Sequence, residues 1–186
     1  MTPSYLALLV ASLVAVVSGT APRQLRAQTI PTPDSTTRAA IDRIAFLEGA
    51  WRGSGWIAFG PERRSFTQRE EVRLLANRSV LLIEGHGTAI DAAGRQVSVH
   101  DALAAIHYDR TQQRYGMRAW RGDGVPIEAR IDAVTDTLRW GFSPMQGVDT
   151  EYIITRSPAG EWLERGYVTR AGTRTQFFEM RLTRVP

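Results

Sequence analysis

The sequence predicts an all-β protein, an antiparallel up-and-down meander of roughly ten strands that closes into a barrel and follows a short N-terminal helix. From Gly49 onward, apolar and polar residues alternate with a period of two, which is typical of strands with one buried face. Turn residues such as Gly60-Pro61 and Ser157-Pro158-Ala159-Gly160 interrupt this pattern at near-regular intervals. Short loops pair neighbouring strands antiparallel, and closure removes the two unpaired edges of an open sheet.

Residues 1–27 have the features of a secretory signal peptide. The apolar run Tyr5–Val17 is shorter than the roughly 20 residues that a membrane-spanning helix needs. Leu25 and Ala27 suit the −3 and −1 positions of a signal peptidase site, so we expect cleavage after Ala27 and export to the periplasm or the medium. Cleavage leaves no stable membrane span, and retention of the segment as an uncleaved anchor is the alternative.

The rest of the chain divides into a tether, residues 28–33, and a single helix-plus-barrel domain, residues 34–186. Prolines disfavour helix in the tether, because each one restricts the residue before it to extended backbone. Asp34 or Ser35 is a suitable N-cap for a short helix that ends near Leu47.

The composition excludes several classes of function. The chain has 186 residues, with 19 acidic residues and 23 basic ones that are all arginine, and it has no cysteine. Disulfide frameworks, cysteine-ligated metals and thiol nucleophiles are therefore excluded. Loss of the signal peptide removes Arg23 and Arg26 and no acid, so the net charge falls by two from +4. The arginines lie among acidic residues and form no basic face, which argues against nucleic-acid binding. Exclusive use of arginine favours a bacterial origin.

One motif carries a resemblance to a known group of barrels. The segment Leu47-Glu48-Gly49-Ala50-Trp51-Arg52-Gly53-Ser54-Gly55, where a short helix runs into the first strand, resembles the calycin superfamily, especially nitrobindin-type and other lipocalin-like bacterial barrels. Ile106-His107-Tyr108-Asp109 and Trp162-Leu163-Glu164 resemble secreted members of the same group. The resemblance covers residues 46–185 and implies a barrel with Trp51 at its base and an internal cavity.

The resemblance does not extend to haem chemistry. Nitrobindin-like barrels bind haem through a histidine near the end of the barrel, whereas the last two predicted strands, Glu161–Arg184, contain no histidine. We therefore expect no cofactor. A metal site needs three or four convergent ligands, and neither His-x-His nor His-Glu-x-x-His spacing occurs. We expect no metal, and no Gly-x-Ser-x-Gly hydrolase motif is present.

The candidate ligand-binding residues are polar side chains on adjacent strands and large aromatic side chains that suit a cavity wall. His100 has no evident partner in the sequence and is expected on the outer surface, while His107 is expected to have a structural role near a loop. The candidates are Gln68, Glu70, Glu84, His86, Asp101, Trp120, Trp140 and Tyr152.

The sequence does not decide which face of the third predicted strand points into the barrel. Glu84 and His86 share one face, and if that face is internal they join the other polar candidates in the cavity. If Leu81, Ile83 and Ala89 face inward instead, Glu84 and His86 face solvent. A one-residue shift exchanges the two faces of a strand, so periodicity alone does not decide.

The function favoured by the sequence is that of an exported barrel that binds a small apolar or amphipathic ligand, with no committed reaction. The first alternative is a structural, envelope-associated barrel with a solid core. The second is an enzyme that uses Glu84, His86 and Asp101 as an acid–base set. We assign no catalytic residue, and the oligomeric state is left open.

Overall fold

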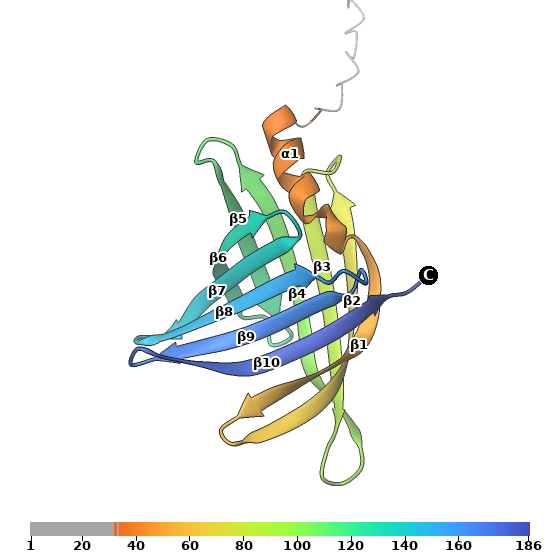
Figure 1. Cartoon of the computed structure of the whole chain (residues 1–186), viewed down its shortest axis with the longest axis vertical. Helices are drawn as coiled ribbons and strands as arrows, with labels where there is room; N and C mark the ends of the chain where they lie inside the picture. Colours follow the sequence, from red (N-terminus) through yellow and green to blue (C-terminus); the bar gives the residue numbers. More distant parts are fainter. Residues whose placement is uncertain (1–31, 33) are drawn as a thin grey trace, which may run out of the picture. The chain divides into compact units, whose positions relative to one another are not determined.

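The computed structural model describes Thr32 and residues 34–186, so the predicted signal peptide and most of the predicted tether lie outside the described residues. The described chain forms an α-helix, a short 3₁₀ helix and ten strands (Figure 1). In order they are α1 (Ser35–Ile44), η1 (Ala45–Leu47), β1 (Gly49–Phe59), β2 (Glu62–Leu75), β3 (Val80–Ile90), β4 (Gln96–Asp109), β5 (Arg114–Arg121), β6 (Pro126–Val134), β7 (Thr137–Met145), β8 (Val148–Arg156), β9 (Trp162–Arg170) and β10 (Thr173–Arg184).

The strands form a closed antiparallel barrel. Each strand pairs with the next one along the chain, and β10 returns to pair with β1. In this closing pair Trp51 lies opposite Arg184, and Ile57 lies opposite Phe178. The predicted fold, a closed meander of ten strands behind a short helix, is confirmed.

Helix α1 begins at the predicted cap. The carboxylate of Asp34 accepts hydrogen bonds from the backbone N–H groups of Thr36 and Thr37, at 2.9 and 3.0 Å. These bonds satisfy two of the amide groups that the first turn of a helix leaves without partners. Ile41 and Ile44 lie one turn apart on the buried face, and both are fully buried. The helix therefore packs by its apolar face, and η1 continues it to the predicted end at Leu47.

A set of buried aromatic residues joins the helical segment to the barrel. The indole N–H of Trp51 donates to the carbonyl of Leu47 at 2.7 Å, and its ring packs edge-to-face on Trp162 at 5.9 Å. The hydroxyl of Tyr115 on β5 donates to the carbonyl of Ala40 in α1, also at 2.7 Å. Trp51 thus fills the barrel base beneath the helix, the position expected for it from the first-strand motif.

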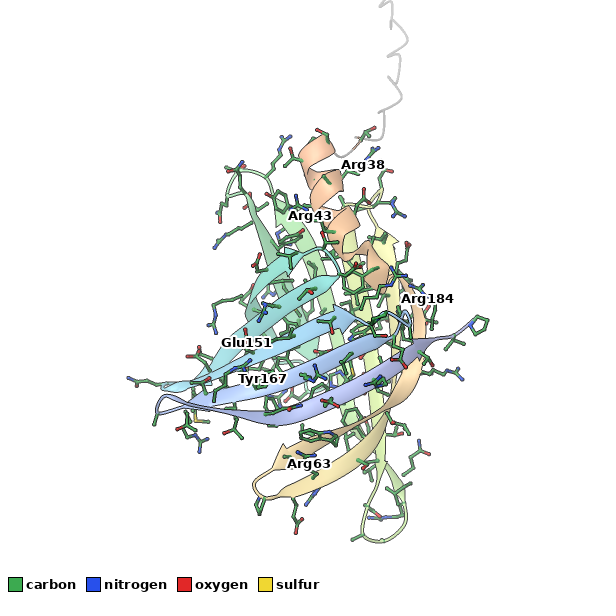
Figure 2. All side chains as sticks on the ribbon, viewed as in Figure 1. Arg38, Arg43, Arg63, Glu151, Tyr167 and Arg184 are labelled. Carbon is green, nitrogen blue, oxygen red and sulfur yellow. The ribbon has the colours of Figure 1, made fainter. Side chains whose placement is uncertain are left out.

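Arg184 fastens the closing strand to the same end of the barrel. Its guanidinium donates to the carbonyl groups of Glu48 and of Phe46, the latter at 3.1 Å, and lies 4.5 Å from the centre of the Trp51 ring. Figure 2 shows Arg184 near the C-terminal end of β10, beside the start of β1. The last strand therefore contributes both to barrel closure and to the orientation of the helical segment.

Glycines in β1 allow the backbones of the first and last strands to approach closely. A Cβ atom on Gly53 would overlap the carbonyl oxygen of Arg181 in β10. A Cβ atom on Gly55 would lie 2.7 Å from the ring of Phe66 and 2.8 Å from Cβ of Met180. Larger residues at these two positions would push β1 away from β10, so the glycines of the motif are required where the barrel closes.

The two ends of the barrel differ. Helix α1 lies at one end, and the β1–β2 and β3–β4 hairpins extend from the other end (Figure 1). Within the part of the chain that the structure describes, no helix has the length and apolar character needed to cross a membrane. Because α1 and Trp51 fill one end of the barrel, a binding site is expected in the interior toward the hairpins.

Candidate functional site

The barrel encloses a cavity of about 1000 Å³. Small side chains on three neighbouring strands leave this space, among them Gly85 on β3, Ala102 on β4 and Ala119 on β5. The cavity extends from the buried Trp162 to the β3–β4 hairpin. The interior is therefore hollow, which does not agree with the alternative of a barrel packed solid.

Aromatic rings form one wall of the cavity. Trp140 on β7 stacks on Tyr152 on β8, with ring centres 4.1 Å apart and planes 8° apart. Tyr152 in turn meets the ring of Phe178 edge-on at 5.8 Å, and Phe178 stacks on Phe66 at 5.6 Å. Such rings supply large apolar surface together with π faces that attract cations.

Glu70 carries a carboxyl group that is almost completely removed from solvent. Its side chain is 6% exposed, and Oε1 accepts a hydrogen bond of 2.7 Å from the amide of Gln68. Burial raises the pKa of Glu70 to about 8; the hydrogen bond from Gln68 opposes this rise, and the charge of Glu164 adds to it. Glu70 is therefore largely protonated at neutral pH.

Glu164 on β9 is a second buried carboxyl on the cavity wall. The indole N–H groups of Trp140 and Trp162 donate to its two oxygens, at 3.2 and 3.3 Å. Burial raises the pKa of Glu164 to about 7, although both indole hydrogen bonds favour the charged form. The two carboxyls share one cavity, and neither has an ion-pair partner among the described residues.

Two glycines on β3 make room for these polar groups. A Cβ atom on Gly85 would lie 2.7 Å from Oε2 of Glu70 and 2.9 Å from Nε2 of His100, so both side chains cover the Gly85 backbone. A Cβ atom on Gly87 would overlap the amide oxygen of Gln68. Because these two glycines of β3 have no side chains, Gln68, Glu70 and His100 come together on one part of the wall.

His100 lines the cavity from β4, and solvent reaches its ring through the open side of that cavity. The surrounding protein lowers the pKa of His100 by desolvation; nearby Asp101 opposes this effect, and His86 adds to it. The ring is therefore neutral at pH 7. His100 is exposed to solvent, as expected for a surface residue, but it lies on the cavity side of β4, on the same face as Ala102 and Ala104. The register shift of β4 lies beyond it, between His100 and Ser98.

Apolar side chains surround the open side of the cavity at the β3–β4 hairpin. Ile90 is 69% exposed and Val99 is 50% exposed, and both line the cavity together with Val97. Exposed apolar residues are common singly, but a group at the entrance of a cavity marks a surface that an apolar molecule can contact.

The structure brings together only half of the predicted site. Gln68, Glu70, Trp140 and Tyr152 line the cavity. The other four candidates, Glu84, His86, Asp101 and Trp120, are absent from its wall and lie on strand faces opposite to cavity-lining neighbours.

The outer residues have partners on the outside of the barrel. Glu84 pairs with Arg73 at 2.5 Å, and Nδ1 of His86 lies 3.1 Å from the carboxylate of Asp101. The side chains of His86 and Asp101 are 44% and 59% exposed. The inward facing of Glu84 and His86 is thus wrong, and the alternative facing of β3 is the one that the structure adopts. Glu84, His86 and Asp101 share no cavity.

Trp120 is also outside the cavity. The guanidinium of Arg118 lies 5.4 Å from the centre of its ring, on the face of β5 opposite to Met117 and Ala119. The expectation that Trp120 faces the cavity is wrong, since β5 directs its smaller apolar residues inward.

Among the wall residues that were not sequence candidates are His100, Trp162 and Glu164. A signal for Glu164 is present in the chain, because strand alternation places it on the same face as Trp162. No cluster of three or more potential metal ligands occurs among the residues that the structure describes.

Comparisons with known proteins show the fold alone. No family model and no curated protein matches the chain. Among solved structures, the Rv2717c protein of M. tuberculosis is 14% identical with a TM-score of 0.54, over 79% of this chain and 98% of that chain. The S-type phycobiliprotein lyase CPES of Guillardia theta is 10% identical with a TM-score of 0.55, over 83% and 99%. These likenesses support the closed antiparallel barrel described above.

Proposed function

We propose that this protein binds a small apolar or amphipathic molecule inside its barrel. The observation that carries the proposal is the cavity of about 1000 Å³, which combines a mainly apolar wall with a few buried polar groups. Ligand sites in proteins have this composition, since apolar surface supplies affinity and a few polar groups fix orientation. The volume lies at the upper end of the roughly 300–1,000 Å³ range of such pockets.

Two further observations support the proposal. The exposed apolar side chains of Ile90, Val97 and Val99 at the entrance suit the passage of an apolar molecule. One solved barrel of similar fold is a phycobiliprotein lyase, and this likeness supports small-molecule binding as the role of the present barrel. We further propose that the chain is a calycin-type barrel and that residues 1–27 direct its export.

The proposal is tested by native mass spectrometry of the protein purified from its own host, which is expected to show an added mass that denaturation releases. The variant Ala102→Phe fills the cavity from the inner face of β4 and is expected to lose the added mass. Ala105→Phe is the matched control, because Ala105 lies on the outer face of the same strand. Protein without any added mass, or equal retention by both variants, would count against the proposal.

A further inference from the structure

Several buried hydrogen-bonding groups deep in the cavity are acceptors. The amide N–H of Gln68 already binds Glu70, and the indoles of Trp140 and Trp162 already bind Glu164, so these three donors are occupied. The amide oxygen of Gln68 is buried and has no hydrogen-bond partner among the described residues. Buried polar atoms are nearly always paired, so an unpaired acceptor beside a cavity indicates a place for a donor from outside.

The charges of the cavity wall also favour a ligand that donates hydrogen bonds. Glu70 and Glu164 are both buried, and the single arginine on the described wall, Arg64, is exposed near the β1–β2 hairpin. A ligand with a carboxylate or phosphate would place a third acidic group beside two buried ones. A ligand with a cationic group would instead compensate them, because an opposite charge favours the ionised form of a buried acid.

The aromatic wall adds a third feature. Trp140 donates from its ring edge to Glu164 and stacks on Tyr152, so aromatic rings adjoin the acidic groups. Aromatic faces attract cations, and Trp does so most strongly. An apolar cavity with acids, acceptors and aromatic faces at one place is complementary to an apolar molecule that ends in an amine.

We infer that the ligand of this cavity is an amphipathic amine, whose ammonium group donates hydrogen bonds to Glu70 and to the amide oxygen of Gln68 while Glu164 supplies further negative charge. This inference rests on the proposed function, and it names the class of ligand. It also implies that binding displaces a proton from the acidic pair, because the amine enters as a cation.

The displaced proton makes the affinity depend on pH. The groups that face Glu70 are Gln68 on the same strand, Trp51 on β1, Gly85 on β3, His100 on β4 and Glu164 on β9. Burial raises the pKa values of Glu70 and Glu164 to about 8 and about 7, and desolvation lowers the pKa of His100. Between pH 6.5 and 8 the two acids therefore lose protons, and an alkylamine remains protonated.

At the entrance, Asp91 and Arg64 also line the cavity. Local hydrogen bonds lower the pKa of Asp91, so its charge is constant in this range. The affinity for an ammonium ligand is thus expected to rise up to about tenfold per pH unit for each proton released.

The experiment compares three probes with the same chain: decylamine, 1-decanol and decanoate. Binding to the full barrel is followed by the fluorescence of the cavity tryptophans and by calorimetry in buffers of different ionisation enthalpy, which counts released protons. At pH 8 we expect decylamine to bind at least about tenfold more tightly than 1-decanol, and decanoate to bind most weakly. The affinity for decylamine is expected to fall between pH 8 and pH 6, while that for 1-decanol does not fall.

Variants separate the acidic pair from the rest of the barrel. Glu70→Gln is expected to lower the affinity for decylamine at least about tenfold and to weaken its pH dependence, with binding of 1-decanol retained. Gln68→Met, which removes the free acceptor at similar volume, should have the same selective effect. Glu84→Gln is the matched control, because it neutralises an acid on the outer face of β3.

The outcomes distinguish this inference from the proposed function. If 1-decanol binds the cavity but decylamine binds no more tightly at pH 8, the inference is wrong and the proposed function stands. Equal loss of decylamine binding in Glu84→Gln and Glu70→Gln would also overturn it. If none of the three probes binds, both fail together.

Discussion

Replacing Glu70 by glutamine is expected to make the protein more stable at alkaline pH. The side chain is 6% exposed, and burial raises its pKa from the ordinary 4.5 to about 8. In the unfolded chain the carboxyl ionises near 4.5, whereas in the folded barrel it keeps its proton up to about pH 8. The buried, protonated carboxyl therefore makes its full contribution to the free energy of unfolding below pH 4.5. This contribution is lost as the pH rises toward 8.

The size of the stability loss follows from the difference between the pKa values of Glu70 in the unfolded and folded states. Each pH unit in this interval lowers the free energy of unfolding by about 1.4 kcal/mol, so the full interval of Glu70 corresponds to roughly 5 kcal/mol. At pH 7 roughly 3 kcal/mol of it has been lost. Glutamine is of similar size and carries no ionisable group, so Glu70→Gln removes this loss. The smaller loss from Glu164, whose pKa is raised to about 7, remains in the variant.

The assay is urea unfolding at pH values from 4.5 to 8.5. The wild-type free energy of unfolding is expected to fall by several kcal/mol over this range, and that of Glu70→Gln to fall much less. Glu84→Gln is the control, since it removes an exposed ion pair with Arg73 and should change stability by less than about 1 kcal/mol. Parallel curves for wild type and Glu70→Gln would refute the reasoning, because they would mean that Glu70 is equally solvated in both states.

Three further predictions concern the architecture and are checked by urea unfolding. Gly53→Ala should destabilise the barrel by about 2 kcal/mol or more, because the new methyl group overlaps the carbonyl of Arg181. A variant as stable as the wild type would contradict this, since it would mean that β1 can shift away from β10 without loss of stability. Tyr115→Phe should cost about 1 kcal/mol by loss of the hydrogen bond to Ala40, and an unchanged midpoint would mean that the bond adds nothing to helix docking. Trp51→Phe should cost about 3 kcal/mol, since it leaves a void and an unpaired carbonyl; a loss under about 1 kcal/mol would contradict the assigned role of Trp51.

The sequence is sufficient to predict the closed barrel, because closure depends on features that act locally. Alternation defines each strand, short turns impose antiparallel neighbours, and the unpaired edges leave closure as the consistent outcome. The helix is predictable for the same reason, since Asp34 caps it and Ile41 and Ile44 share its buried face.

The facing of individual strands is less predictable, because both phases of a period-two pattern can look acceptable. On β3 the inner face carries Gly85 and Gly87, whose lack of side chains gives no apolar signal, while the outer face carries Glu84 and His86. The register shift beside Gly87 adds a further change that the pattern does not contain. Glu84, His86, Asp101 and Trp120 were misplaced because a period-two pattern leaves the phase of each strand open, and the register shift lies outside the segments that carry them.

The burial of Glu70 and Glu164 was still harder to predict in full. Acidic residues are rarely buried without a partner, so an acid within a strand is ordinarily assigned to the outer face. Glu70 was a candidate as a polar side chain on the strand that precedes Glu84 and His86, whereas Glu164 appeared only as part of a resembling motif. The pairing of the two acids depends on the curvature of the closed barrel, which brings β2 and β9 to one cavity and which no local pattern contains.

The cost of these two acids is itself an argument that the cavity holds a ligand. The helical end, with Trp51 and Ile41, supplies a packed core, whereas Glu70 and Glu164 reduce stability progressively as the pH rises above 4.5. An apolar residue at either position would remove that loss, so packing alone gives no reason for an acid there. A cation that binds only the folded state would compensate the ionised pair and add stability by mass action. With saturating decylamine, the free energy of unfolding is therefore expected to fall less toward alkaline pH than without it. An unchanged pH dependence would mean that the two acids take no part in binding the ligand.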